Sequence, residues 1–200
     1  MISEKFKLGI TGGIGSGKTS VCRVFEVLQI PVFSADRVAQ EIMESDKEII
    51  KGINSIAGRD LYLSGKLDRM TLAKIIFNDN SLLNKVNSLV HPVVFEHFRS
   101  WVPEQTAPYV IMEAAILFES GASEIVDRIA TIIAPEDERI HRVILRNKLS
   151  TKQITQRMRN QMDDEARAKN SYYIIYNSEN EMIIPAILTI HNDILNFIKN

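Results

Sequence analysis

One stretch near the start of the chain fits the pattern G-x-x-x-x-G-K-[S/T]. It reads Gly12-Gly13-Ile14-Gly15-Ser16-Gly17-Lys18-Thr19. An apolar run at 8–10 precedes it, and apolar residues at helical spacing over 21–28 follow it. A strand, a glycine-rich loop and a helix in this order form a P-loop, whose backbone N–H groups surround phosphate oxygens. A glycine-rich turn with a chance lysine is the alternative, but the flanking pattern favours a nucleoside triphosphate site.

The residue types of this loop have separate roles in phosphate chemistry. We expect the Lys18 ammonium to reach the β- and γ-phosphates and the Thr19 hydroxyl to hold Mg²⁺. The glycines allow the backbone N–H groups to turn toward phosphate oxygens. The predicted phosphate-binding residues are Gly13, Ile14, Gly15, Ser16, Gly17, Lys18, Thr19 and Ser20.

The composition excludes several classes of protein. The 200 residues suit one compact α/β unit, and a net charge of −1 argues against a general nucleic-acid binder. The single cysteine, Cys22, excludes an internal disulfide, and its helical context favours a buried filler over a reactive thiol. No run approaches the ~18 apolar residues of a membrane span, and residues 1–7 lack the apolar core of a secretory signal. We expect a soluble, cytoplasmic protein without nucleic-acid or membrane partners; the oligomeric state stays open.

Five apolar runs predict the strands of a parallel sheet covered by helices on both faces. They lie at 6–11, 30–33, 109–112, 128–134 and 172–176. Helical patterns separate them, and an amphipathic helix over 181–198 follows the last. The predicted fold is therefore a three-layer α/β/α P-loop NTPase with a five-stranded parallel sheet.

Asp36 follows the second predicted strand directly. Ligands of open parallel sheets bind outside the carboxyl ends of the strands, so we expect this carboxylate at the edge that carries the phosphate loop. A second role is to cap the helix predicted at 37–43, which Ser34 could do equally well. The two roles of Asp36 are compatible.

The stretch 37–108 is mostly helical in pattern and lies between two predicted strands, which suits a region that binds the acceptor of a reaction. Within it, Pro92 disfavours helical geometry at His91, so we expect the chain to bend or break there. A lone histidine is usually structural, and contact of His91 with a ligand is the other alternative.

Between residues 139 and 162 there are seven Arg or Lys residues and no Asp or Glu. Arg139, Arg142 and Arg146 share one helical face, and Arg157 and Arg159 fall in the next predicted helix. We expect this basic segment to face phosphate, since a solvated basic face normally contains interleaved acids. No linker separates these parts. We therefore expect one P-loop kinase unit over 1–200, with a core (1–36, 109–135, 171–200), a helical acceptor-binding insertion (37–108) and a helical, basic lid region (136–170).

Three classes of P-loop protein compete. A GTPase would need N-K-x-D, whereas the nearest string at 147–150 ends in serine, and no D-x-x-G occurs. A motor or AAA-type ATPase would need more chain, and the run 111–113, which ends in Glu113, is only a weak Walker B motif. A small-molecule kinase needs a phosphate loop, an acid near the acceptor hydroxyl, an acceptor-binding insertion and an arginine-rich lid. The chain has all four in that order.

Several motifs resemble those of the dephospho-CoA kinase family, in collinear order from about Leu8 to Asn177. The stretch 10–19 is similar to L-T-G-G-I-G-S-G-K-S, 34–36 to D-A-D, 90–92 to L-H-P, and 115–119 to P-L-L-F-E. Arg142 and Arg146 resemble R-x-x-x-R, 157–161 resembles R-I-x-x-Q, and 173–178 resembles Y-V-I-D-N-S. The departures are Ser34 and Tyr176 for aspartates, Ala115 for proline, Asn147 for an acid and Glu179 for the usual glycine.

The resemblance implies ATP-dependent phosphorylation of the 3′-hydroxyl of dephospho-CoA, giving CoA and ADP, the last step of coenzyme A biosynthesis, with Mg²⁺ as cofactor. The catalytic residues implied are Asp36, Lys18, Arg142 and Arg146. Arg142 and Asn177 would also bind ATP, and Asp36, His91, Arg157 and Gln161 would bind the acceptor. The alternatives are a kinase for another small metabolite or nucleotide and a non-catalytic ATP-binding protein; the choice between ATP and GTP stays open.

Overall fold

The structure is a computed structural model that describes residues 5–77, 79–147, 150–159 and 161–200. It divides into two compact units. The sheet unit comprises Met1–Ser34 and Val102–Asn200, and the helical unit comprises Ala35–Trp101. Each unit is described by itself below.

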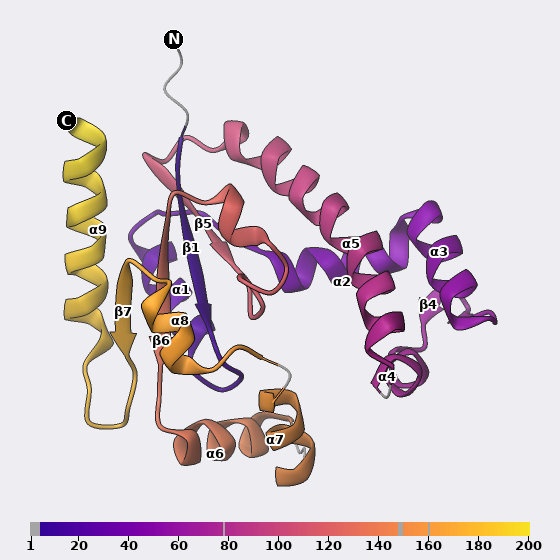
Figure 1. The fold of residues 1–200 in the computed structure, drawn as a ribbon. Coiled ribbons are helices and arrows are strands. Elements are labelled where there is room, and N and C mark those ends of the chain that lie inside the picture. Colours follow the sequence, from indigo (N-terminus) through magenta and orange to yellow (C-terminus); the bar gives the residue numbers. More distant parts are fainter. Residues whose placement is uncertain (1–4, 78, 148–149, 160) are drawn as a thin grey trace. The chain divides into compact units, whose positions relative to one another are not determined.

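The sheet unit is built on five parallel strands in the order β2-β5-β1-β6-β7 (Figure 1). The five predicted strands and their parallel arrangement are confirmed, with bounds shifted by one or two residues. The strands are β1 (Phe6–Gly12), β2 (Val32–Ser34), β5 (Tyr109–Glu113), β6 (Arg128–Ile133) and β7 (Tyr173–Tyr176).

The strand register brings the carboxyl ends of three strands together. Glu113, the last residue of β5, pairs with Ser34 of β2 on one side and with Ile10 of β1 on the other. The phosphate loop begins where β1 ends, at Gly12. The first predicted site and the end of the second predicted strand therefore lie at one edge of the sheet, as the topological rule requires.

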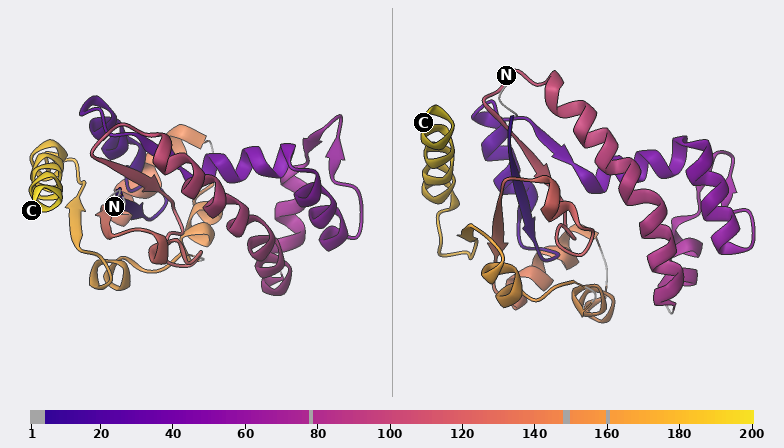
Figure 2. Two further views of the ribbon diagram at one scale, coloured as in Figure 1. Left: turned by 90° about the horizontal axis from the view of Figure 1, so that it is seen from above. Right: turned by 45° about the horizontal axis from the view of Figure 1, so that its top comes forward.

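One face of the sheet carries the main core. Strand residues such as Leu8 and Ile132 pack against α1 (Lys18–Val27) and α9 (Ile183–Lys199), and α9 lies beside β7 in both views of Figure 2. Cys22 lies in this core, and burial raises the pKa of its thiol far above the ordinary range. The expected role of Cys22 as a filler is confirmed.

The other helices of the sheet unit lie on either side of β5 in the chain or follow β6. They are α6 (Glu136–Asn147), α7 (Thr151–Arg159), α8 (Asp164–Lys169) and two short 3₁₀ turns, η1 (Val102–Glu104) and η2 (Ala122–Ile125). The sequence pattern did not predict α8, because six residues are too few to show a helical period. Its cap is clear in the structure, where the Asp163 carboxylate accepts a hydrogen bond from the Ala166 N–H at 2.8 Å.

The described residues of the helical unit form four helices and a small hairpin. The helices are α2 (Ala35–Ser45), α3 (Lys47–Ala57), α4 (Arg69–Phe77) and α5 (Asn80–Trp101), and the hairpin pairs β3 (Tyr62–Leu63) with β4 (Lys66–Leu67). Within the described ranges, no helix of either unit combines the length and apolar character needed to cross a bilayer.

Two local predictions about this unit, a chain break at Pro92 and a helix cap at Asp36, are wrong. The chain does not break at Pro92, because α5 continues through His91 and Pro92 to Trp101. The buried residues Val86, Val90, Val94 and Phe98 recur every four positions along α5, and their packing outweighs the cost of one proline. Asp36 does not precede its helix as a cap either; it lies in the first turn of α2, where the helix dipole favours a carboxylate.

Candidate active site

The phosphate loop joins β1 to α1 in a backbone conformation that requires glycine. Gly15 and Gly17 have φ angles of 80° and 97°, in the left-handed region. Space is also limited, because a Cβ at Gly15 would lie 2.5 Å from the Arg139 carbonyl oxygen and one at Gly17 would lie 2.0 Å from the Asn177 Nδ2. The loop therefore packs tightly against α6 and the turn after β7.

Three carbonyl groups of the loop accept hydrogen bonds from side chains. The Lys18 ammonium donates to the Gly12 carbonyl at 2.8 Å. The Arg139 Nε donates to the Ile14 carbonyl at 3.0 Å, and the Asn177 Nδ2 donates to the Ser16 carbonyl at 2.7 Å. In a planar trans peptide the C=O and the following N–H point in opposite directions. Arg139 and Asn177, which bind the Ile14 and Ser16 carbonyls from outside the loop, thus direct the N–H groups of Gly15 and Gly17 to the opposite side, as a phosphate-binding loop needs.

The polar residues at the start of α1 suit a phosphate-bound cation. Thr19 and Ser20 are exposed in the first turn of α1, and Lys18 beside them is half-buried. Mg²⁺ prefers oxygen ligands and usually keeps several waters, with few protein ligands and the remainder from substrate phosphates. An exposed hydroxyl at Thr19 fits that requirement.

Glu113 is a candidate site residue that the sequence analysis did not assign to the site. Its carboxylate accepts a hydrogen bond from the Ser34 hydroxyl at 3.0 Å, at the carboxyl edge of the sheet. The charge of Glu113 raises the pKa of Cys22 in α1, and the charge of Lys18 lowers it. The weak Walker B match at 111–113 was the signal that could have identified Glu113.

The basic face predicted on α6 is only partly open to phosphate. Arg139 is 7% exposed, and its Nη1 lies 2.8 Å from the Asp164 carboxylate. Arg142 forms an ion pair with Glu138 at 2.6 Å, whereas Arg146 is exposed in the last turn of α6. Arg139 and Arg142 therefore have acidic partners from outside the segment 139–162. Glu138 precedes the acid-free segment and Asp164 follows it, so a count within the segment missed both.

Two predicted ATP-binding residues lie together beside the loop. The Arg142 Nη1 donates to the Asn177 carbonyl at 3.1 Å, while the Asn177 side chain donates to Ser16. Residues from α6, from the turn after β7 and from the loop are thus joined by hydrogen bonds into one group.

Gln161, predicted to bind the acceptor, also reaches the phosphate loop. Its Oε1 accepts a hydrogen bond from the Ile14 N–H at 2.8 Å, and its Nε2 donates to the Ala115 carbonyl at 3.4 Å. Both backbone groups of Ile14 are consequently held by side chains from the predicted lid region, since Arg139 binds the carbonyl. The side chain of Arg157 lies outside the described residues.

In the helical unit, Asp36 and His91 influence each other electrostatically. Burial lowers the pKa of His91, and the charge of Asp36 acts in the opposite direction. The His91 ring stacks on Phe95 one turn further along α5, at a centroid distance of 6.2 Å. A separate groove of about 830 Å³ lies between α3 and α5, and its described lining includes neither Asp36 nor His91.

The family model and the curated relatives indicate one family. A family model for dephospho-CoA kinase matches residues 6–182. The chain is similar to dephospho-CoA kinases of Bacteroides fragilis (38% identity, covering 91% of this chain and 89% of the relative) and Chlorobaculum tepidum (36%, covering 92% and 95%). Among solved structures it is similar to TT1252 from Thermus thermophilus, with a TM-score of 0.83, 28% identity and 98% of each chain covered. A Campylobacter jejuni dephospho-CoA kinase (TM-score 0.68, 24% identity, 96% and 98% covered) shares the fold.

Proposed function

This chain belongs to the dephospho-CoA kinase family, and on that premise we propose that it transfers the γ-phosphoryl group of ATP to the 3′-hydroxyl of dephospho-CoA. The products are CoA and ADP, and the reaction is the last step of coenzyme A biosynthesis. The observation that carries the proposal is the family match over 6–182. The matched region includes the P-loop, whose Ile14 and Ser16 carbonyls accept hydrogen bonds from side chains outside the loop. A cytoplasmic location remains a prediction from the sequence.

The donor side of the reaction would use the sheet unit. The loop from Gly13 to Ser20 would bind the phosphates, with Lys18 on the β- and γ-oxygens. The Thr19 hydroxyl would hold Mg²⁺, and the ion would supply positive charge against the phosphate oxygens. Arg142 and Asn177 would contact ATP, which their position beside the loop supports.

Arginines of the proposed lid region, 136–170, would act on the transferred group. Phosphoryl transfer has a loose transition state with charge on the equatorial oxygens, so catalysis depends on position and charge neutralisation. Arg142 and Arg146 would supply that charge from α6, and Arg157 would approach the acceptor from α7. The i, i+4 spacing of Arg142 and Arg146 places both guanidinium groups along one side of α6.

The acceptor side would use the insertion 37–108 together with Asp36. The acceptor's 3′-oxygen would form a bond to the γ-phosphorus as the bond from that phosphorus to ADP breaks, and the hydroxyl proton would pass to the Asp36 carboxylate. His91 and Gln161 would hold other parts of the acceptor. The electrostatic coupling of Asp36 with His91 supports their use at one site.

The test is acceptor-dependent formation of ADP by the purified protein. Dephospho-CoA should stimulate ADP release and gain one phosphate by mass, whereas CoA, whose 3′-position already carries a phosphate, should do neither. Nucleoside monophosphates serve as rival acceptors. Equal stimulation by a nucleoside monophosphate would point to another small-molecule kinase, and ATP binding without stimulation by any acceptor would point to a non-catalytic binding protein.

A further inference from the structure

A buried cluster of charges lies behind the phosphate loop, and the proposed reaction does not use it. The Asp164 carboxylate pairs with two guanidinium groups, those of Arg139 and Arg167. The two arginines are 7% and 1% exposed. Buried ion pairs are weak evidence for stability, because the cost of desolvation offsets most of their attraction. Stability alone therefore does not account for this cluster.

The electrostatics indicate that Asp164 holds the cluster together. Burial lowers the pKa of the Arg167 guanidinium, and the charge of Arg139 acts in the same direction. The carboxylates of Asp164, Glu119 and Asp163 oppose this, with Asp164 the strongest of the three. Without the Asp164 charge, the two guanidinium groups would repel each other.

The other side of Arg139 lies on the loop. Its Nε donates to the Ile14 carbonyl at 3.0 Å while its Nη1 binds Asp164 at 2.8 Å. The same guanidinium covers Gly13, where a Cβ would lie 2.1 Å from its Nη2. The guanidinium is planar, with its donors in fixed directions, so the contact with Asp164 sets the direction of the bond to Ile14. A lysine at this position offers one point charge and cannot fix both directions.

We propose that Arg139 is a positioning residue of the phosphate site. Asp164, itself bound to Arg167, orients the Arg139 guanidinium, which holds the Ile14 carbonyl on the outer side of the loop. Because the Ile14–Gly15 peptide is planar, the Gly15 N–H is then directed to the inner side, toward phosphate. The inference rests on the proposed function only in requiring that the loop binds ATP; the acceptor plays no part in it.

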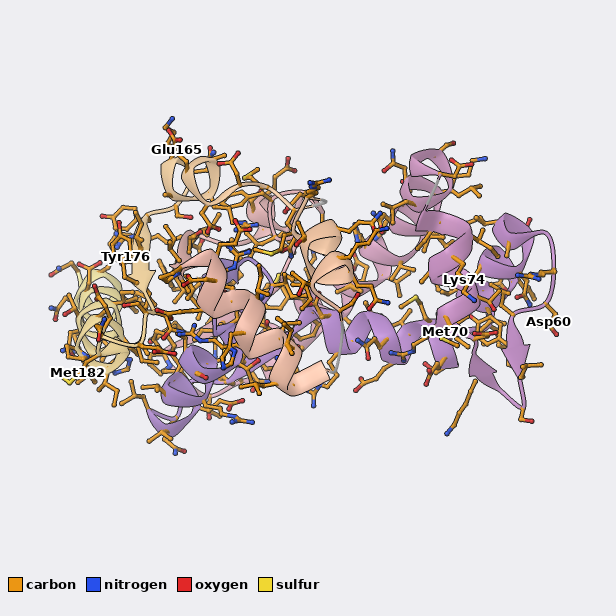
Figure 3. All side chains as sticks on the ribbon, turned by 90° about the horizontal axis from the view of Figure 1, so that it is seen from below. Asp60, Met70, Lys74, Glu165, Tyr176 and Met182 are labelled. Carbon is orange, nitrogen blue, oxygen red and sulfur yellow. The ribbon has the colours of Figure 1, made fainter. Side chains whose placement is uncertain are left out.

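A neighbouring acid provides a matched control. Glu165 is the next residue of α8, but its side chain is 80% exposed and pairs with Lys169 at the surface. Figure 3 shows Glu165 projecting away from the body of the sheet unit. Loss of the Glu165 charge should leave the loop unchanged, whereas loss of the Asp164 charge should not.

The test compares the binding of ATP, inorganic tripolyphosphate and adenosine to full-length variants by calorimetry. Arg139→Lys and Asp164→Asn should weaken the binding of ATP and tripolyphosphate about tenfold, the size expected for one charge-assisted hydrogen bond, and leave adenosine unchanged. Glu165→Gln should bind all three like the wild type. Adenosine is the readout that separates positioning from a general loss of structure, which would weaken all three ligands together.

A second variant keeps the test decisive if the first ones fold poorly. Arg139→Met leaves Asp164 and Arg167 as an ion pair with no net charge, and the methionine fills most of the volume of the arginine. The variant should therefore unfold at close to the wild-type temperature. It should show the same tenfold loss for tripolyphosphate. Wild-type affinity for tripolyphosphate in folded Arg139→Met, or an equal loss for adenosine, would overturn the proposal. Turnover of dephospho-CoA by the wild type is measured in parallel, so that failure of the proposed function is seen separately.

Discussion

The sheet unit and the helical unit hold their candidate residues in different ways. In the sheet unit, the carbonyls of Ile14 and Ser16 accept hydrogen bonds from side chains that lie 125 and 161 positions further along the chain. In the helical unit, Asp36 and His91 are carried by α2 and α5, and apolar packing sets the position of α5. A substitution far from the loop should therefore disturb phosphate binding. A substitution at Asp36 should remove only its own chemistry.

The largest effect is expected at Lys18. Lys18→Ala removes the charge that would neutralise the β- and γ-oxygens and the donor that binds the Gly12 carbonyl. We expect turnover to fall by about 10³-fold or more, together with ATP affinity. Calorimetry with ATP and a coupled ADP assay would measure the two. Retained ATP affinity would contradict the assignment of the phosphate loop.

Asp36→Asn is the matching change in the helical unit. It keeps the size of the side chain and removes the proton acceptor. Turnover should fall by roughly 10²- to 10⁴-fold, the range for loss of a general base, while ATP affinity stays at the wild-type value. Near-normal turnover would remove Asp36 as the base. A fall in ATP affinity would mean that Asp36 also contributes to ATP binding, contrary to the difference expected between the two units.

Asn177 should give a smaller effect on the donor side alone. Asn177→Ala removes the hydrogen bond to the Ser16 carbonyl, which directs the Gly17 N–H. We expect the KM for ATP to rise about tenfold and the KM for dephospho-CoA to stay unchanged. Steady-state kinetics with each substrate varied in turn would show this. A parallel rise in both constants would mean that the turn after β7 serves both substrates.

The smallest effect concerns pH and compares one histidine from each unit. Burial lowers the pKa of His91 and of His191, whose Nδ1 lies 2.8 Å from the Tyr109 hydroxyl. The unfolded chain then binds more protons than the folded one below about pH 6.5, the ordinary histidine pKa, so acidification from pH 7 to 5 should lower the melting temperature. His91→Gln and His191→Gln should each make the melting temperature less dependent on pH. Thermal unfolding between pH 7 and 5, followed by circular dichroism, would measure this. An unchanged pH dependence in both variants would exclude histidine burial as its cause.

Local patterns were sufficient for much of this protein. The spacing of apolar residues predicted the five strands, and the order of strand, loop and helix predicted the phosphate site, because both depend on neighbours in the sequence. The prediction of a break at Pro92 was wrong because packing between distant residues outweighed a local preference. The rule for the residue before proline states a local steric preference, and in α5 the packing of buried residues on either side outweighs it.

Side-chain partners could not be found in the same way. Arg139 belongs by sequence to a basic face, yet its acid, Asp164, lies beyond α7 and in a helix too short to predict. Gln161 matches a family motif expected at the acceptor, yet it contacts Ile14. Glu113 was visible only as a weak motif, and its bond to Ser34 depends on the strand register.

By itself the sequence determined that a P-loop lies between β1 and α1, that the sheet is parallel, and which family the chain resembles. These properties follow from periodicity, glycine conformation and short motifs, all of which are local. The tertiary structure alone decided which side chains hold the loop, namely Arg139, Asn177 and Gln161, and that Arg139 is buried. A hydrogen bond requires a donor within about 3 Å of its acceptor, and only the folded chain brings such distant residues that close.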